Sequence, residues 1–77
     1  PEVYQTGGRS DIVAEHPTGI WIFELKVDKS AKEALDQIRS RDYLRAYLAD
    51  GRPIYALGLA FDSKTRQLVD TDAEQLR

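Results

Sequence analysis

Three charged side chains in the first third of the sequence have the types and the spacing that a metal-dependent hydrolytic site needs. Asp11 opens a short β-branched run, whereas Glu24 and Lys26 stand one residue apart near the end of a long apolar run. In an extended strand, residues two positions apart point to the same face and lie roughly 6 to 7 Å from each other. An unpaired buried charge destabilises a fold by several kcal/mol, so the Glu24–Lys26 pair requires an explanation beyond folding.

The chemistry that these residues could perform is hydrolysis of a phosphodiester. Carboxylates directed into one pocket can hold Mg²⁺ (or Mn²⁺), which prefers hard oxygen ligands. Lys26 beside the metal would orient the attacking water and offset charge on the phosphate, and Gln37 in the next helix would hydrogen-bond the water or a phosphate oxygen. The sequence therefore predicts a metal site formed by Asp11, Glu24 and the backbone carbonyl of Leu25. The predicted catalytic set is Asp11, Glu24, Lys26 and Gln37.

A β-hairpin is the element that must bring the carboxylates together. Residues 19–27 carry large apolar side chains on both faces, which is typical of a central strand. A Pro-Thr-Gly turn joins them to a second strand-like run at residues 9–16, which follows a glycine-containing loop at residues 5–9. Asp11 and Glu24 then lie at comparable distances from the bend, and cross-strand neighbours are about 5 Å apart. We expect the two carboxylates to converge if the strand register permits.

A helix is expected after the second strand. Ser30 is a favourable N-cap residue, and Glu33 three positions later completes a capping box. Apolar side chains then recur at helical spacing, are interrupted at residues 39–42, and resume beyond them. We therefore predict one helix to about Arg41, followed by a second helical piece or a bent continuation to Ala49.

The remaining segments predict a mixed α/β sheet in a single domain, residues 1–77. Residues 54–61 form an apolar run that a right-handed crossover would place parallel to the central strand. Residues 66–70 have the pattern of a short antiparallel edge strand, and residues 71–77 that of an incipient helix or a frayed end. The predicted order is ββαββ, with one main helix bent near residues 39–43.

Only one face of this sheet would be covered by the predicted helix. Trp21 and Phe23 alternate with Glu24 and Lys26 and therefore lie on the opposite face. We expect that face to be covered by sequence upstream of Pro1 or by a second copy in a homodimer. The proline at position 1, where a complete chain would have methionine, suggests a fragment of a longer protein.

The overall composition excludes several classes of protein. The sequence has no cysteine and a single histidine, which excludes a disulfide framework, zinc fingers and poly-histidine metal sites. No apolar run approaches the roughly 18 residues of a transmembrane helix, and the first residues are not a signal peptide, so we expect a cytoplasmic location without a membrane partner. The net charge of −2 is not that of a strongly basic nucleic-acid binder. It is compatible with an enzyme whose carboxylates meet phosphate through a metal ion.

A set of short motifs extends from about Gly7 to Thr71. The motifs are Gly8-Arg9-Ser10-Asp11, Phe23-Glu24-Leu25-Lys26, Ala34-x-x-Gln37-Ile38-x-x-x-x-Tyr43, Tyr47-Leu48-Ala49-Asp50-Gly51 and Phe61-x-Ser63-x-Thr65-Arg66. Together they resemble the PD-(D/E)XK nuclease superfamily. The likeness is in particular to the nuclease-like domain at the C-terminus of predicted AAA-ATPase-like bacterial proteins.

This resemblance implies a restriction-endonuclease-like core of αβββαβ type, whose first helix would lie upstream of residue 1. It implies Asp11 and Glu24 as metal ligands, Lys26 as the catalytic lysine and Gln37 as a helix-borne auxiliary. Ser10 departs from the proline of the family name, at a position known to vary. The sequence contains no GxxxxGK[ST] motif, so an ATPase activity would belong to other sequence. We expect a Mg²⁺-dependent domain that hydrolyses nucleic acid, and DNA is the expected substrate.

Two other interpretations remain open on the sequence. The domain could be a nuclease-like module that no longer cleaves and serves in nucleic-acid binding or dimerisation, or a structural fragment in which Glu24 and Lys26 form an ordinary ion pair. Tyr43 has the pattern of a core-edge residue that packs the helix bend rather than that of a catalytic group. Basic side chains could form a phosphate-contacting rim or simply a solvated face: Arg9, Lys29, Lys32, Arg39, Arg41 and Arg45.

Overall fold

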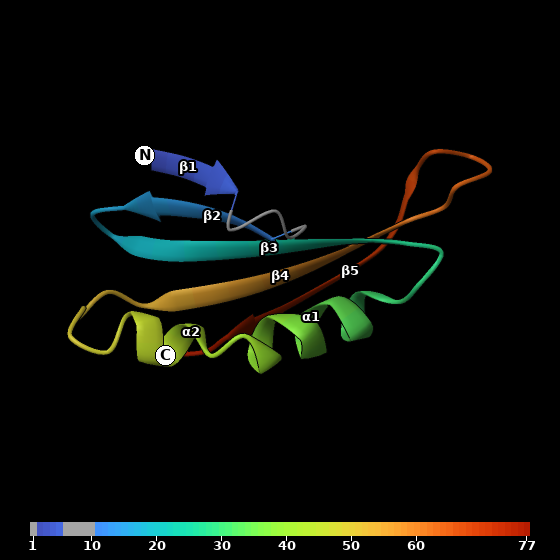
Figure 1. The fold of residues 1–77 in the computed structure, drawn as a ribbon. Helices are drawn as coiled ribbons and strands as arrows, with labels where there is room; N and C mark the ends of the chain where they lie inside the picture. The colour runs from blue at the N-terminus through green and yellow to red at the C-terminus, as the bar shows by residue number, and fades with distance from the viewer. Residues whose placement is uncertain (1, 6–10) are drawn as a thin grey trace.

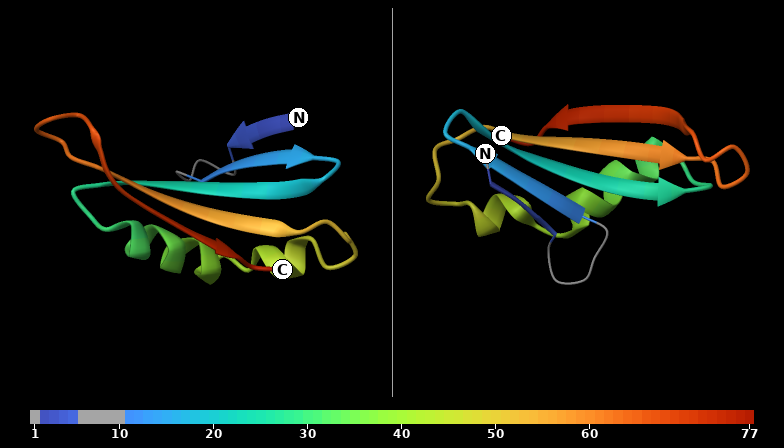
Figure 2. Two further views of the ribbon diagram at one scale, coloured as in Figure 1. Left: turned by 180° about the vertical axis from the view of Figure 1, so that it is seen from behind. Right: turned by 90° about the horizontal axis from the view of Figure 1, so that it is seen from above.

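The computed structural model describes residues 2–5 and 11–77 as a five-stranded mixed sheet with both helices on one face (Figures 1 and 2). The elements are β1 (Glu2–Gln5), β2 (Asp11–His16), β3 (Gly19–Val27), α1 (Ala31–Ser40), α2 (Tyr43–Ala46), β4 (Ile54–Phe61) and β5 (Leu68–Gln75). The strands lie side by side in the order β1-β2-β3-β4-β5. This α/β arrangement is compatible with a restriction-endonuclease-like core, as the sequence predicted. No helix in the described part is long and apolar enough to cross a membrane.

β3 is the central strand of the sheet. It pairs antiparallel with β2 and parallel with β4, so the predicted hairpin and the predicted parallel crossover are both confirmed. β1 pairs antiparallel with β2, and β5 forms the other edge, antiparallel to β4. The part of the predicted loop at residues 6–9 lies outside the described residues.

α1 packs on the sheet through one apolar face. The side chain of Ser30 accepts a hydrogen bond from the backbone N–H of Glu33 at 3.0 Å, which confirms the predicted N-cap. Gly58 of β4 allows the helix to approach closely, because a Cβ atom at this position would lie 2.3 Å from the carbonyl oxygen of Ala31. The buried residues of the helix are Ala31, Ala34, Leu35 and Ile38.

The helix breaks before Tyr43, as the interrupted apolar stripe predicts. Asp42 adopts the left-handed conformation, with φ 53° and ψ 48°, and thereby separates α1 from α2. α2 ends at Ala46 rather than continuing to Ala49. The break allows the side chains of Arg41 and Tyr43 to reach the first residue of β2.

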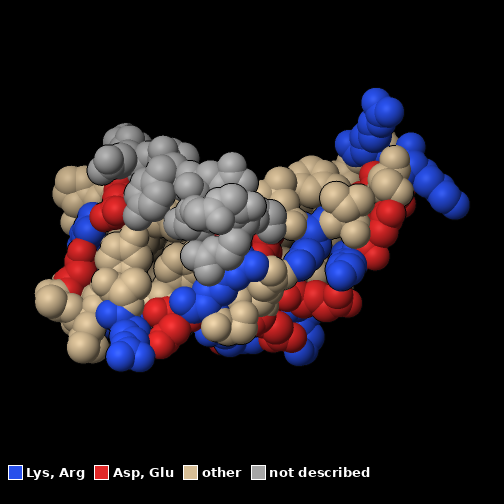
Figure 3. Space-filling view, viewed as in Figure 1, with Lys and Arg blue, Asp and Glu red and all other residues tan. Residues whose placement is uncertain are grey.

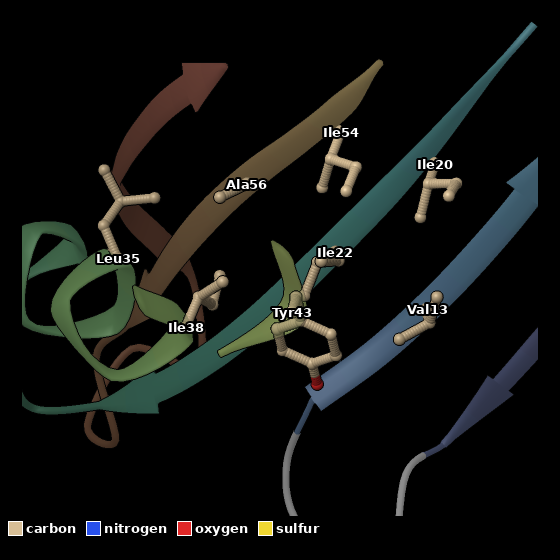
Figure 4. Close-up of a cluster of buried hydrophobic side chains, with 8 residues drawn as sticks. All are labelled: Val13, Ile20, Ile22, Leu35, Ile38, Tyr43, Ile54 and Ala56. Carbon is tan, nitrogen blue, oxygen red and sulfur yellow. The ribbon is translucent and has the colours of Figure 1, made fainter. Parts of the chain in front are cut away.

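Buried apolar side chains from the sheet and from both helices form one core (Figure 4). Tyr43 is 6% exposed, and its ring lies among these side chains with the hydroxyl at the start of β2 (Figure 4). The other members are Val13, Ile20, Ile22, Leu35, Ile38, Ile54 and Ala56. The core therefore fixes the helix break relative to β2 and β3.

The opposite face of the sheet carries aromatic and aliphatic side chains and no helix of the described residues. Trp21 and Phe23 lie there, half-buried, as predicted. Trp21 stacks on Tyr55 of β4, with ring centroids 5.5 Å apart and an interplanar angle of 23°. We call this surface the open face; it comprises Trp21, Phe23, Leu25, Tyr55, Leu57, Leu59 and Phe61.

Two strands differ from the sequence-based expectation. β1 was not predicted, and β5 runs to Gln75, where a helix or a frayed end was expected. β5 is held by antiparallel pairing with β4 and by contacts with α1, in which Glu74 forms an ion pair with Arg39 at 2.5 Å and Oδ2 of Asp70 accepts a hydrogen bond from the N–H of Ala31 at 3.2 Å. Tertiary contacts thus stabilise a strand whose residues have little β-propensity.

Candidate functional site

Asp11 and Glu24 form a pair of buried carboxylates on neighbouring strands. Asp11 is the first residue of β2 and lies directly opposite Glu24 in the register of β2 and β3. Both side chains are 0% exposed. Carboxylates in this position lose their hydration and repel each other, so they require a positive charge or hydrogen-bond donors as compensation.

Arg41 supplies the positive charge. Its Nη1 atom forms an ion pair with Oδ1 of Asp11 and a second one, at 3.2 Å, with Oε1 of Glu24. Arg41 is the C-cap residue of α1, directly before the left-handed Asp42, and its side chain is 15% exposed. A single guanidinium therefore connects the helix break to both strands of the hairpin.

Tyr43 supplies a further donor from the helical piece beyond the break. Its hydroxyl donates a hydrogen bond to Oδ2 of Asp11 at 2.6 Å. Both carboxylate oxygens of Asp11 are therefore bound, one by Arg41 and one by Tyr43. Among the described residues, no buried side-chain nitrogen or oxygen lacks a hydrogen-bond partner. The buried polar atoms of the described site are thus hydrogen-bonded within the folded chain.

These contacts shift the pKa of Asp11 downward. Burial by itself would raise this pKa, but the neighbouring Glu24 carboxyl, the hydrogen bonds from Tyr43 and Arg41, and the charge of Arg41 together outweigh burial. Burial likewise opposes the charged form of Arg41, whose pKa is nevertheless raised by Asp11 and Glu24. Asp11 is therefore an ionised carboxylate at neutral pH, and Arg41 is a permanent cation.

Lys26 and Leu25 follow Glu24 along β3. Strand alternation places Lys26 on the face of Glu24, partly exposed and opposite Ala60 of β4. Within the described residues the Lys26 side chain forms no hydrogen bond or ion pair. The side chain of Leu25 belongs to the open face. Lys26 therefore lies two residues after Glu24 and on the same face of the sheet, but the two side chains do not form an ion pair.

Gln37 lies on α1, one turn before Arg41, and is half-buried. Its backbone carbonyl oxygen accepts a hydrogen bond from Oγ of Ser40 at 2.7 Å. In the part of the chain that the structure describes, no hydrogen bond joins its side chain to Asp11 or Glu24. The fold brings the two carboxylates together and leaves Gln37 on the neighbouring helix.

The basic side chains expected to form a phosphate-contacting rim fall into separate groups. Three form ion pairs within the fold: Lys32, Arg39 and Arg41. Two are exposed and form no ion pair with any other described residue: Lys29 and Arg45. Arg9 lies outside the described residues. In Figure 3, basic and acidic side chains alternate on the viewed face, and Lys and Arg atoms project furthest at the end of the β4–β5 loop.

The contacts of Arg41 and Tyr43 with Asp11 were not foreseen from the sequence. The packing role predicted for Tyr43 is confirmed, but its hydroxyl also binds the carboxylate. Arg41 was grouped with the surface cations, although its side chain is mostly buried. The usable signal was the demand of two buried carboxylates for a cation, together with the arginine at the break of the apolar helix stripe.

The donor set for a metal ion is small. The described residues contain no group of three or more His, Cys, Asp or Glu side chains that could hold a metal. Asp11 and Glu24 are therefore a two-carboxylate set. Mg²⁺ is commonly bound by one or two carboxylates and completes its octahedral shell with other oxygens, including water.

Comparison with known proteins relates the chain to a nuclease family. The family model described as PD-(D/E)XK nuclease superfamily matches residues 1–71. The chain is similar to a protein of Azotobacter chroococcum mcd 1 named "Uncharacterized protein in vnfD 5'region", with 34% identity over 71 residues. That match covers 90% of this chain and 14% of the relative, so the chain spans a small part of its length. No solved structure matches the chain.

Proposed function

Because the chain belongs to the PD-(D/E)XK nuclease superfamily, we propose that it is a nuclease domain that hydrolyses phosphodiester bonds of nucleic acid, DNA in the first place. The observation that carries this proposal is the pair of fully buried carboxylates, Asp11 and Glu24, opposite each other on neighbouring strands. Lys26 follows on the same face. Acidic side chains are seldom fully buried, and a pair of them on adjacent strands costs stability that a function would justify.

The carboxylate pair fits a divalent cation that prefers oxygen ligands, Mg²⁺ or Mn²⁺. Asp11 and Glu24 offer carboxylate oxygens, and a positive charge, Nη1 of Arg41, already lies within contact of both. The backbone carbonyl of Leu25 is the proposed third protein ligand. When bound, the cation would supply Lewis-acid chemistry at the phosphate.

Lys26 and Gln37 are the proposed catalytic partners of the pair. The ammonium of Lys26, which has no partner among the described residues, would orient the attacking water and stabilise the negative charge that grows on the phosphate. The amide of Gln37 would hydrogen-bond the water or a phosphate oxygen. Asp11, whose lowered pKa keeps it ionised, would remain an acceptor throughout.

Nucleic acid would be held through its phosphates by exposed cations that the fold does not already pair. Such contacts orient a nucleic-acid backbone without reading its bases. The exposed candidates among the described residues are Lys29, Arg45, Lys64 and Arg66. Arg39 and Lys32 are weaker candidates, since each is engaged by Asp36.

A cleavage assay with single-stranded and double-stranded DNA and with RNA tests this proposal. We expect cleavage that requires Mg²⁺ or Mn²⁺ and disappears in Lys26→Ala, while the circular dichroism spectrum of the variant stays that of the wild type. Lys29→Ala is the comparison variant, because Lys29 is an exposed lysine proposed to contact phosphate, and its loss should weaken nucleic-acid binding without abolishing cleavage. Cleavage that persists in Lys26→Ala, or in excess EDTA, would contradict the proposal.

A second candidate function is favoured by the ion pairs of Arg41. They satisfy both carboxylates within the protein, as expected of a nuclease-like module that no longer cleaves and instead binds nucleic acid or dimerises. Such a module would bind DNA with the same affinity in the presence of Mg²⁺ and of EDTA. The active domain would show metal-dependent cleavage under the same conditions.

We further infer that the open face is covered in the working protein, by a second copy in a homodimer. The stacked Trp21–Tyr55 pair and the apolar side chains around it provide a continuous surface suited to sheet-on-sheet packing. The substitution Trp21→Glu places a charge on this face and should shift the protein from dimer to monomer, which analytical ultracentrifugation measures. A wild type that is strictly monomeric at high concentration would contradict the homodimer and favour cover by another segment of a longer chain.

The wider setting is also part of the proposal. The motifs shared with the C-terminal domains of AAA-ATPase-like bacterial proteins support a place in a protein of that kind, in the cytoplasm. The relative, of which the chain matches 14%, is compatible with a longer architecture. A co-purified full-length protein with ATPase activity would support this context, and a full-length gene product without it would not.

A further inference from the structure

We propose that Arg41 holds the place of the divalent cation between Asp11 and Glu24 in the metal-free protein, so that metal binding requires the guanidinium to leave them. The inference rests on the proposed function, because it concerns the same carboxylate pair. It concerns how the site is kept folded before the metal enters, and it assigns Arg41 as a positioning residue.

The contact geometry carries the proposal. One nitrogen atom, Nη1, contacts Oδ1 of Asp11 and Oε1 of Glu24, the latter at 3.2 Å. A cation held by both carboxylates would need the oxygens that now contact this nitrogen. Oxygen ligands lie about 2.1 Å from Mg²⁺, so the nitrogen and the ion cannot both be held there. The two positive groups would also repel each other in a site where both carboxylates are 0% exposed. Occupation by Arg41 and by the metal is therefore competitive.

The charge balance gives the reason for this arrangement. Without a cation, the negative charge of this carboxylate pair would destabilise the fold, because neither side chain is exposed to water. Arg41 is charged at every physiological pH, so it compensates the pair in the absence of metal. Tyr43 would stay on Oδ2 of Asp11 during the exchange, since it bonds the oxygen that Arg41 does not.

The position of Arg41 allows it to leave without unfolding the sheet. It follows the last residue of α1, and its side chain is 15% exposed, whereas Asp11 and Glu24 lie in paired strands. Rotation of the side chain toward solvent breaks the two ion pairs and no backbone hydrogen bond of the sheet. The arginine, rather than either carboxylate, is therefore the movable member of the trio.

Titration of Mn²⁺ into Arg41→Met, Arg41→Lys and the wild type tests the proposal, by calorimetry and by the electron paramagnetic resonance of the bound ion. All the measurements are made at one pH, pH 8, because metal affinity depends on pH. We expect the metal-free Arg41→Met protein to melt at a lower temperature, to bind Mn²⁺ tighter by about tenfold or more, and to gain more thermal stability from Mn²⁺. The melting temperature and the Mn²⁺ affinity of Arg41→Lys should lie between those of Arg41→Met and of the wild type.

Arg39→Met is the matched control. Arg39 lies on the same helix and also pairs with two carboxylates, Asp36 and Glu74, but at the surface. Its Mn²⁺ affinity should equal that of the wild type. If Arg41→Met does not fold, a tighter Mn²⁺ affinity of Arg41→Lys supports the proposal and an unchanged or weaker affinity overturns it.

The outcomes separate this inference from the proposed function. Equal or weaker Mn²⁺ binding by Arg41→Met overturns the role of Arg41 while leaving a metal-dependent nuclease in place. Tighter binding by the variant, in a protein that cleaves no nucleic acid, supports the role of Arg41 and overturns the hydrolytic function. Absence of Mn²⁺ binding in the wild type and in both Arg41 variants overturns the two together.

Discussion

The hydroxyl of Tyr43 donates a hydrogen bond to Oδ2 of Asp11 at 2.6 Å, across 32 positions of the sequence. This bond ties the helical piece beyond the break to the first residue of β2. Removal of the hydroxyl leaves a buried carboxylate oxygen without its donor, so Tyr43→Phe should lower the free energy of unfolding by about 1 to 3 kcal/mol. Urea denaturation measures the change.

Tyr55→Phe is the control for Tyr43→Phe. Tyr55 lies on the open face, stacked on Trp21, and its hydroxyl forms no hydrogen bond with another described residue. Its loss should change the free energy of unfolding by less than about 0.5 kcal/mol. Equal effects of the two substitutions would mean that the bond to Asp11 contributes no stability.

Asp42 should tolerate glycine better than a β-branched residue. Its φ of 53° lies in the left-handed region, which glycine adopts freely and which costs other residues roughly 1 to 2 kcal/mol, less for Asp and Asn. Asp42→Val should therefore destabilise the fold by about 1 kcal/mol or more in urea denaturation. Asp42→Gly should leave the free energy of unfolding close to that of the wild type, and a greater loss for glycine than for valine would contradict the assignment.

Gly58→Ala should destabilise the packing of α1 on β4. The added Cβ would lie 2.3 Å from the carbonyl oxygen of Ala31 and 3.0 Å from Cβ of Ala34, so the helix must move outward. We expect a loss of about 1 to 3 kcal/mol in thermal or urea unfolding. Gly51→Ala is the matched control, because nothing lies within 4 Å of a Cβ there, and it should be neutral or slightly stabilising.

The ion pair of Asp50 with Arg52 should contribute to acid unfolding. Hydrogen bonds from the side chain and backbone of Arg52 lower the pKa of Asp50 from 3.8 to about 2. A carboxyl whose pKa is lower in the folded chain stabilises the fold above its unfolded pKa and loses this contribution as the pH falls through the folded pKa. The loss should therefore fall between about pH 5 and pH 2.

Asp50→Asn isolates this contribution. Its free energy of unfolding should fall less steeply over that pH range than the free energy of the wild type. Thr71→Ser, at the exposed surface of β5, changes no titratable group and is the control, so it should retain the slope of the wild type. Parallel pH curves for Asp50→Asn and the wild type would contradict the role of the Asp50–Arg52 pair.

Local sequence signals were sufficient for most of the fold. The turn before Gly19 predicted the hairpin, and the apolar runs predicted β3 and β4. Ser30 and Glu33 predicted the start of α1. Each of these signals acts within a few residues. β5 depends instead on pairing with β4 and on contacts with a helix more than 30 residues earlier, neither of which its composition shows, so a shorter strand was predicted.

The carboxylate pair of the candidate site could be predicted from the sequence, whereas the cation that contacts it could not. The strand pattern placed Asp11 and Glu24 on one hairpin, and the register of β2 and β3 sets them opposite each other. Period and spacing cannot show which cation approaches two buried acids, because that depends on how the chain turns at Asp42. Arg41 therefore had the pattern of a surface residue until the helix break was seen in three dimensions.

The polar character of β5 bears on how copies of this domain can associate. As an outer strand it offers backbone groups to which a foreign strand could add, but it carries several acidic side chains, Asp70, Asp72 and Glu74. Two copies aligned along this edge would bring carboxylates close to carboxylates, and like charges on paired strands are unfavourable. Strand-by-strand growth of the sheet from this edge is thereby discouraged.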